Sequence, residues 1–176
     1  MTKIIDLSFE IASGMDVYSG DPEVKFEKTH DVEKDGYSVT KLSFGTHTST
    51  HIDAQAHMIG NGKTLSDYDV DKFSGKAILI DEGDELVSSE VLIFREGKFS
   101  NEVIDKIIEL KPKMVGFGRD NDLDIPKIKR LLDEDILVVG PLRLDSVLPN
   151  RFLFNAFPLM IKEGDGSPVR AVAFID

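Results

Sequence analysis

The middle of the chain alternates between short apolar runs and amphipathic segments, and this alternation constrains the fold more than any other feature. Apolar runs rich in β-branched residues predict strands over residues 77–80, 114–117 and 136–139. Helical spacing of apolar residues predicts one helix between residues 100 and 112 and a second over residues 125–132. The pattern predicts an α/β fold with a mixed sheet and flanking helices.

Further elements are predicted toward both ends of the chain. Additional strands are expected over residues 3–11, 37–44, 157–162 and 169–175. Residues 164–168, with the sequence Gly-Asp-Gly-Ser-Pro, are predicted to form the hairpin turn between the last two strands. A short helical turn is expected after Ser66 and before Gly75. No repeat or linker interrupts the 176 residues, so residues 1–176 are predicted to form a single domain.

The composition argues against several classes of function. Asp and Glu total 32 against 21 Lys and Arg, and the net charge of −11 opposes binding to nucleic acid or to an anionic membrane surface. The chain has no cysteine, which excludes disulfides, a thiolate nucleophile and cysteine-ligated metals. No apolar segment has the length of a signal peptide core or a membrane span, so a cytoplasmic location is expected.

Three of the four histidines lie within eleven residues, at positions 47, 51 and 57. His47, His51 and Asp53 offer the ligand types of zinc and related divalent metals, and three protein ligands with one open position are typical of a catalytic site. His57 could transfer a proton near pH 7 beside a metal that lowers the pKa of water toward about 7. The same cluster is also compatible with a structural metal site, or with a polar strand that binds no metal.

The spacing predicts a bend in the chain between His47 and His51. In a single α-helix, Asp53 would lie on a different face from His47. In a straight strand all of these residues would face one side, but His47 and His51 would be roughly 13 Å apart at about 3.3 Å per residue. Both can bind one ion only if Thr48, Ser49 and Thr50 turn or bulge, and their hydroxyl groups could then support the ligands.

The histidine cluster resembles the signature of a known family. That family carries the pattern His-x-Gly-Thr-His-x-Asp-x-x-x-His, and this chain matches it except for Ser49, which replaces the glycine and needs a compatible backbone angle. Further similar segments lie at residues 5–8, 14–22, 36–37, 73–77 and 164–171. Over nearly its whole length the chain resembles the cyclase family of metal-dependent hydrolases, which includes bacterial kynurenine formamidase and isatin hydrolase.

This resemblance implies a swivelling β/β/α fold and a homodimer or higher homo-oligomer. It implies one divalent metal ion, zinc or manganese, on His47, His51 and Asp53, with His57 as the residue that transfers a proton. The implied activity is hydrolysis of a non-peptide C–N bond in a small-molecule substrate, such as a formamide, a cyclic amide or a related carbonyl compound. By position, Tyr18 resembles a substrate-facing wall, although an ordinary exposed turn aromatic is equally compatible with the sequence. Gln55 stands where the family usually has proline, and it is a second candidate for contact with substrate.

Departures from the family pattern keep an alternative open. No histidine follows His57, and the segment around residues 148–155 is short, so a second metal held by later residues is not expected. The same shortening is the reason for an alternative function, a metal- or small-ligand-binding relative that has lost hydrolysis. Arg119 follows a predicted strand and could face a substrate carboxylate, although the sequence alone favours an ordinary surface role.

Overall fold

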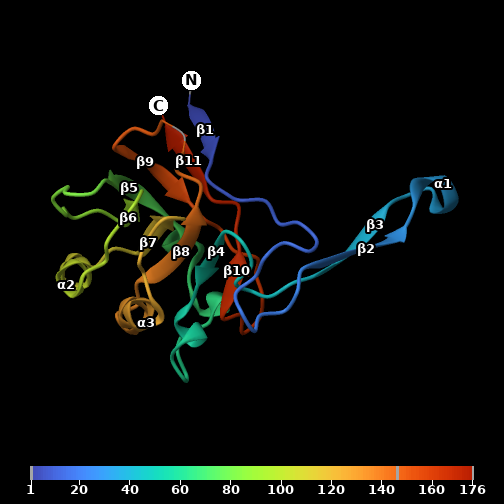
Figure 1. The fold of residues 1–176 in the computed structure, drawn as a ribbon, viewed down its shortest axis with the longest axis horizontal. Coiled ribbons are helices and arrows are strands. Elements are labelled where there is room, and N and C mark those ends of the chain that lie inside the picture. The colour runs from blue at the N-terminus through green and yellow to red at the C-terminus, as the bar shows by residue number, and fades with distance from the viewer. Residues whose placement is uncertain (1, 146, 176) are drawn as a thin grey trace.

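A computed structural model describes residues 2–145 and 147–175. Within them, nine strands form one mixed sheet: β1 (Lys3–Asp6), β4 (His51–Asp53), β5 (Ser74–Ile80), β6 (Val91–Phe94), β7 (Met114–Gly118), β8 (Leu137–Leu142), β9 (Arg151–Asn155), β10 (Gly166–Pro168) and β11 (Val172–Ile175). Their order across the sheet is β1-β11-β9-β5-β6-β7-β8-β4-β10 (Figure 1). Strands β5 to β8 are parallel neighbours, and the other pairs are antiparallel.

Two hydrophobic cores lie on opposite faces of this sheet. One contains Ile52, Leu79, Ile93, Val139 and Phe154 together with other buried side chains of the curled sheet. The other lies under two helices, α2 (Asn101–Leu110) and α3 (Ile125–Asp133). Because side chains alternate along a strand, Ile52 enters the first core while its neighbours His51 and Asp53 point to the opposite face.

Both predicted helices are confirmed, and each begins at a polar cap. The Ser100 side chain accepts a hydrogen bond from the Val103 amide at the start of α2, and Asp124 accepts one from the Lys127 amide at the start of α3. Apolar residues at helical spacing then face the sheet. The expected helical turn between Ser66 and Gly75 is present as two short 3-10 segments, η2 (Leu65–Asp67) and η3 (Val70–Phe73).

The α/β class with a mixed sheet is confirmed, but two predictions near the C-terminus are wrong. Residues 157–162 do not form a strand: in this stretch only Pro158 bridges, to Val169, whereas β9 lies earlier and alternately buries Phe152 and Phe154. Residues 164–168 are not a hairpin turn either, because residues 166–168 are β10, paired with β4. Glycine and proline suggested a turn there, and pairing with a distant strand outweighed that local preference.

The other differences concern strand lengths and short strands. The first predicted strand ends at Asp6 rather than continuing to residue 11, and the last begins only at Val172. Strands β4 and β6 and the hairpin strand β2 (Lys25–His30) were not predicted. None of the helices in the described parts of the chain is both long enough and apolar enough to cross a membrane.

A two-stranded hairpin extends away from the body of the molecule (Figure 1). Strand β2 pairs with β3 (Val39–Ser43), and the short helix α1 (Val32–Asp35) lies at the tip. Every residue of β3 is exposed, and the hairpin presents large apolar side chains to solvent: Phe26, Val32, Tyr37, Val39 and Leu42. Two-stranded hairpins are marginally stable by themselves in water, and exposed apolar patches of this kind often mark interaction sites.

Candidate metal centre

The predicted bend between His47 and His51 is present and is centred on Ser49. The φ angle of Ser49 is 57°, in the left-handed region, which explains why the family pattern has glycine at this position. The Ser49 hydroxyl donates a hydrogen bond to the Phe9 carbonyl at 3.1 Å. The buried Thr50 hydroxyl donates one to the Pro141 carbonyl at 2.7 Å. These bonds hold the reversed backbone, so that His47 faces His51 and Asp53.

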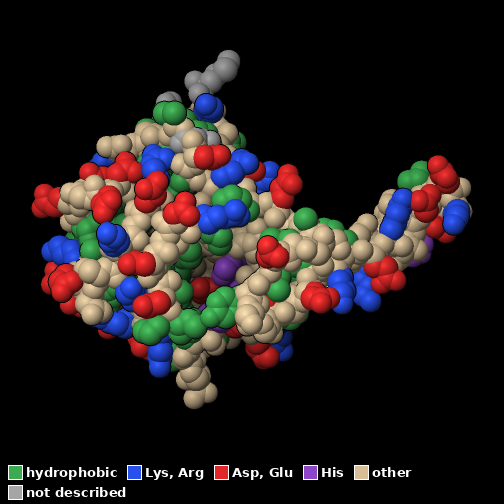
Figure 2. Space-filling view, viewed as in Figure 1, with side chains coloured by type: hydrophobic (Ala, Val, Ile, Leu, Met, Phe, Trp, Pro, Cys, Tyr) green, Lys and Arg blue, Asp and Glu red, His purple; other side chains and the backbone are tan. Residues whose placement is uncertain are grey.

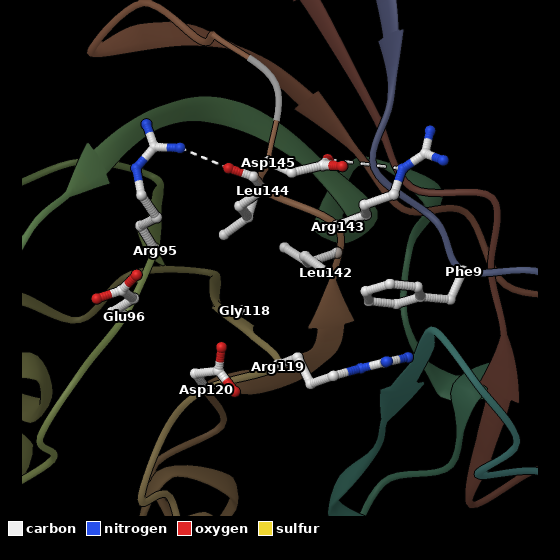
Figure 3. A pocket seen from close by; sticks show the side chains of 10 residues that line it. All are labelled: Phe9, Arg95, Glu96, Gly118, Arg119, Asp120, Leu142, Arg143, Leu144 and Asp145. Carbon is white, nitrogen blue, oxygen red and sulfur yellow. Dashed lines mark hydrogen bonds and ion pairs between the residues drawn. The ribbon is translucent and has the colours of Figure 1, made fainter. Parts of the chain in front are cut away.

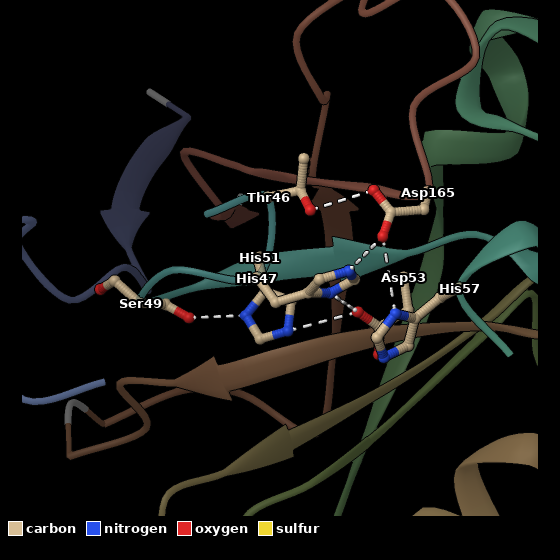
Figure 4. Close-up of polar contacts among 7 residues, drawn as sticks. All are labelled: Thr46, His47, Ser49, His51, Asp53, His57 and Asp165. Atoms are coloured by element: carbon tan, nitrogen blue, oxygen red, sulfur yellow. Dashed lines mark hydrogen bonds and ion pairs between the residues drawn. The ribbon is translucent and has the colours of Figure 1, made fainter. Parts of the chain in front are cut away.

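Two imidazole rings meet at a buried carboxylate in this centre (Figure 4). Asp53 is only 5% exposed, and its Oδ1 lies 2.7 Å from Nδ1 of His47 and 3.3 Å from Nε2 of His51. In Figure 2, histidine side chains are visible in a hollow of the surface beside the base of the hairpin. The three residues predicted from the sequence as a metal site are therefore gathered around one point that is open to solvent on one side.

The remaining hydrogen bonds of the two rings fix where their lone pairs point. His51 Nδ1 lies 2.7 Å from the Ser49 carbonyl, which can only accept, so this nitrogen carries the proton. His47 Nε2 lies 3.0 Å from the Asp165 carboxylate and donates to it. Each ring therefore directs its other nitrogen toward Asp53 Oδ1. A proton on His47 Nδ1 can bridge to Asp53 in the metal-free chain, and a divalent metal that displaces it would meet two imidazole nitrogens and a carboxylate oxygen, which is a donor set that such metals bind.

Asp165 is a site residue that the sequence did not reveal. It lies just before β10, where its Oδ1 accepts a hydrogen bond from the Thr46 hydroxyl at 3.0 Å and its Oδ2 holds His47. The Gly166 that follows allows this close approach, since a Cβ atom there would lie 2.5 Å from Cε1 of His47. The available signal for this residue was the similarity of residues 164–171 to the family, but the segment was interpreted as a turn and not as part of the site.

His57 lies beside the centre, at the end of the 3-10 segment η1 (Gln55–His57). Its ring packs against that of His47 in a tilted arrangement, with the centroids 3.8 Å apart, and its Nδ1 is 3.7 Å from Asp165 Oδ2. Partial burial lowers the pKa of His57 below its usual value, although nearby Asp53 and Asp165 oppose the shift. The ring is therefore neutral at pH 7 and is able to accept a proton.

The carboxylates of the centre favour the addition of positive charge, either as a proton or as a bound cation. Burial opposes protonation of His47, but hydrogen bonds and charge interactions with Asp53 and Asp165 outweigh it and raise the pKa to about 9. Burial likewise acts to raise the pKa of Asp53, yet His47 and His51 hold it well below its ordinary value. A carboxylate that stays ionised beneath two imidazoles provides the charge that a bound cation needs.

We expect metal affinity to increase with pH between 6.5 and 8.5. At these values the metal-free chain keeps a second proton on His47, because its pKa is about 9, and metal binding must release that proton. Loss of one proton corresponds to about a tenfold tighter apparent Kd per pH unit. Zinc titration in competition with a chelator at three pH values measures the slope. An affinity that does not change with pH would contradict the assignment of His47.

We expect Asp165→Asn to weaken metal binding by about 10- to 100-fold without removing it, because the variant loses the charged partner that orients His47. The same variant should show a smaller pH slope, since one of the two carboxylates that raise the pKa of His47 is gone. Chelator competition measures both quantities. Glu163→Gln removes a negative charge from an exposed residue two positions away and serves as the matched control, which should bind metal as the wild type does.

The two residues proposed from the sequence to contact substrate lie in different settings. Tyr18 is 71% exposed, in the loop that precedes β2. Gln55 is engaged within the chain: its Nε2 donates to the Leu132 carbonyl at 2.8 Å, and its Oε1 accepts from the Lys63 amide at 3.2 Å. Both amide atoms thus fasten η1 to neighbouring segments. Contact of either residue with substrate stays a prediction.

The sequence matches the family model described as putative cyclase over residues 5–109, which include the entire histidine cluster. The chain belongs to the cyclase family. Among curated proteins similar to this chain, the kynurenine formamidase of Bacillus cereus (strain ZK / E33L) is 30% identical, in a match covering 96% of this chain and 95% of the relative. The kynurenine formamidase of Salinibacter ruber is 29% identical, with 96% of each chain covered.

Solved structures share the fold of this cyclase. Isatin hydrolase A from Labrenzia aggregata, bound to benzyl benzoate, aligns with a TM-score of 0.83 and 19% identity over 99% of this chain and 94% of that one. A potential metal-dependent hydrolase with cyclase activity aligns with a TM-score of 0.78 and 23% identity over 99% and 98% of the two chains. At these identities the likeness establishes the shared architecture.

Proposed function

We propose that this protein is a metal-dependent hydrolase that cleaves a non-peptide C–N bond in a small formamide, a cyclic amide or a related carbonyl compound. The observation that carries the proposal is the convergence of two imidazole nitrogens on buried Asp53, with the neutral ring of His57 packed against that of His47. The names of the relatives, kynurenine formamidase and isatin hydrolase, support the same class of reaction.

His47, His51 and Asp53 would hold one divalent ion, zinc or manganese, since two imidazoles and a carboxylate suit both metals. When bound, such an ion supplies Lewis-acid polarisation of a carbonyl group and a lower pKa for water. Ser49 and Asp165 keep the two rings in the orientation that binding requires. The hollow beside the hairpin leaves one side of the centre accessible to a small molecule.

His57 would act as the general base and then the general acid in this reaction. Its neutral ring accepts a proton from the attacking water and delivers that proton to the leaving nitrogen, so one water and one amide give an acid and an amine. The nearby Asp165 carboxylate stabilises the imidazolium that forms between these two transfers. Stacking on His47 keeps the ring next to the centre throughout.

Metal removal combined with a substrate panel tests this function. The purified protein would be assayed on formanilide, a lactam and phenyl acetate, then stripped with a chelator and reloaded with zinc or manganese. We expect hydrolysis of an amide that is lost on stripping and restored by metal. Activity that survives complete metal removal would contradict the mechanism. A loaded protein that hydrolyses none of the compounds would favour a ligand-binding relative without hydrolytic activity.

We also propose that a second copy of the chain covers the exposed hairpin, giving a homodimer or a higher homo-oligomer. The apolar side chains of β2 and β3 support this arrangement, because the hairpin stands clear of its own body (Figure 1). Light scattering coupled to size-exclusion chromatography should give at least twice the chain mass. Leu42→Glu, which places a charge on this surface, should shift the mass toward that of one chain, whereas a wild-type monomer would contradict the proposal.

A further inference from the structure

A cavity of about 450 Å³ opens at the carboxyl ends of the parallel strands β6, β7 and β8 (Figure 3). Its lining contains three arginines, Arg95, Arg119 and Arg143, and three acidic residues, Glu96, Asp120 and Asp145. Ligands of open α/β sheets commonly bind outside the carboxyl ends of parallel strands, and this volume suits a small molecule. The position and size of the cavity therefore favour a ligand-binding role.

The cavity adjoins the metal centre through Phe9 and β8. The Phe9 amide donates a hydrogen bond to the Thr50 hydroxyl at 2.9 Å, and Thr50 directly precedes His51 in the chain. On the neighbouring strand, His51 lies opposite Gly140, whereas Leu142 of the cavity follows two residues later. The cavity and the metal centre therefore share strand β8 and the contact between Phe9 and Thr50.

Arg119 is the basic group in this cavity that is free to bind a ligand. Its guanidinium lies over the Phe9 ring, 4.1 Å from the centroid, and in residues 2–145 and 147–175 its side chain has no hydrogen bond or ion pair. Arg95, by contrast, pairs with Asp81 at 2.9 Å, and Arg143 Nη2 donates to the Asp6 carbonyl at 3.3 Å. Figure 3 shows the Arg119 side chain extending toward Phe9 and away from Asp120.

We propose that Arg119 binds a carboxylate group of the substrate, and this inference rests on the proposed hydrolase function. Stacking on Phe9 restrains the plane of the guanidinium and leaves its N–H edge open for a bidentate carboxylate. Because the net charge of the chain is −11, an acidic substrate needs such a local cation. The substrate class is a small amide that also carries a carboxylate group.

The test compares 4-formamidobenzoate with formanilide, which has the same scissile bond and no carboxylate. Steady-state kcat/KM would be measured for the metal-loaded wild type, Arg119→Gln and Arg151→Gln. Arg151 is an exposed arginine of β9 and controls for the loss of one positive charge. We expect Arg119→Gln to lose about 10- to 100-fold on 4-formamidobenzoate and less than about twofold on formanilide. Arg151→Gln should match wild type on both.

Equal effects of Arg119→Gln on the two compounds would overturn the carboxylate site and leave the hydrolase function intact. If neither compound is hydrolysed, calorimetric titration of the metal-loaded protein with 4-(2-oxopropyl)benzoate tests the carboxylate site by binding alone. This ketone carries the carboxylate but has no scissile C–N bond. Binding at least about tenfold weaker in Arg119→Gln than in Arg151→Gln would support the site independently of turnover. Equal affinity in the two variants, or no binding to wild type, would overturn it.

Discussion

Asp53→Asn should leave the protein without metal and reduce amide hydrolysis to background. The substitution keeps the shape of the side chain but removes the charge at the point where His47 Nδ1 and His51 Nε2 meet. An amide group in that position would present either a neutral oxygen or an N–H donor, and neither replaces an anionic ligand. We expect metal affinity to fall by more than about 100-fold, beyond what loss of an outer hydrogen-bond partner costs.

Elemental analysis of the purified variant and turnover at saturating zinc or manganese measure this effect together. Asp69→Asn is the matched control, because Asp69 is an exposed carboxylate of the same chain whose side chain caps no helix. The control should keep about one metal ion per chain and full activity. Retention of the same metal content by Asp53→Asn would show that the ion binds elsewhere.

His57→Ala should reduce turnover by about 10²- to 10⁴-fold while metal content stays at the wild-type level. The two effects separate because His57 stacks on His47 and lies 3.7 Å from Asp165, whereas the three converging donor atoms belong to other residues. Removing the ring takes away the group that carries the proton and leaves the donor atoms of His47, His51 and Asp53 in place.

Metal analysis, thermal unfolding and turnover of one substrate in the same preparations measure the result. Added imidazole should restore part of the activity of His57→Ala, because a small base can enter the space left by the side chain. A variant with full activity would exclude His57 from proton transfer. A variant that loses its metal would instead show that His57 contributes to metal binding.

The local parts of this fold and site were predictable from the sequence, and the distant pairings were not. Helices α2 and α3 carry their caps and apolar spacing within one stretch of chain, and the histidine cluster is contiguous. The bend at Ser49 followed from the reach of a strand alone. Asp165, by contrast, meets His47 from 118 residues away, which local pattern cannot indicate.

The errors near the C-terminus have the same physical origin. Gly166 and Pro168 have turn preferences, yet pairing with β4 makes their segment a strand, and the apolar residues between 157 and 162 form no strand because β9 already occupies the place beside β5. Arg119 shows a further limit. Its place after a predicted strand made it a candidate, but only the structure separates its guanidinium, which lies free on Phe9, from the engaged side chains of other arginines nearby.

The pairing of β10 with β4 has a consequence for the order of events during synthesis. His47, His51 and Asp53 leave the ribosome long before Asp165 and the strand that follows it. A nascent chain therefore carries all three converging donors before it can orient His47. Since chains begin to fold while they are being translated, tight metal loading becomes possible only after Asp165 has been made and β10 has paired with β4.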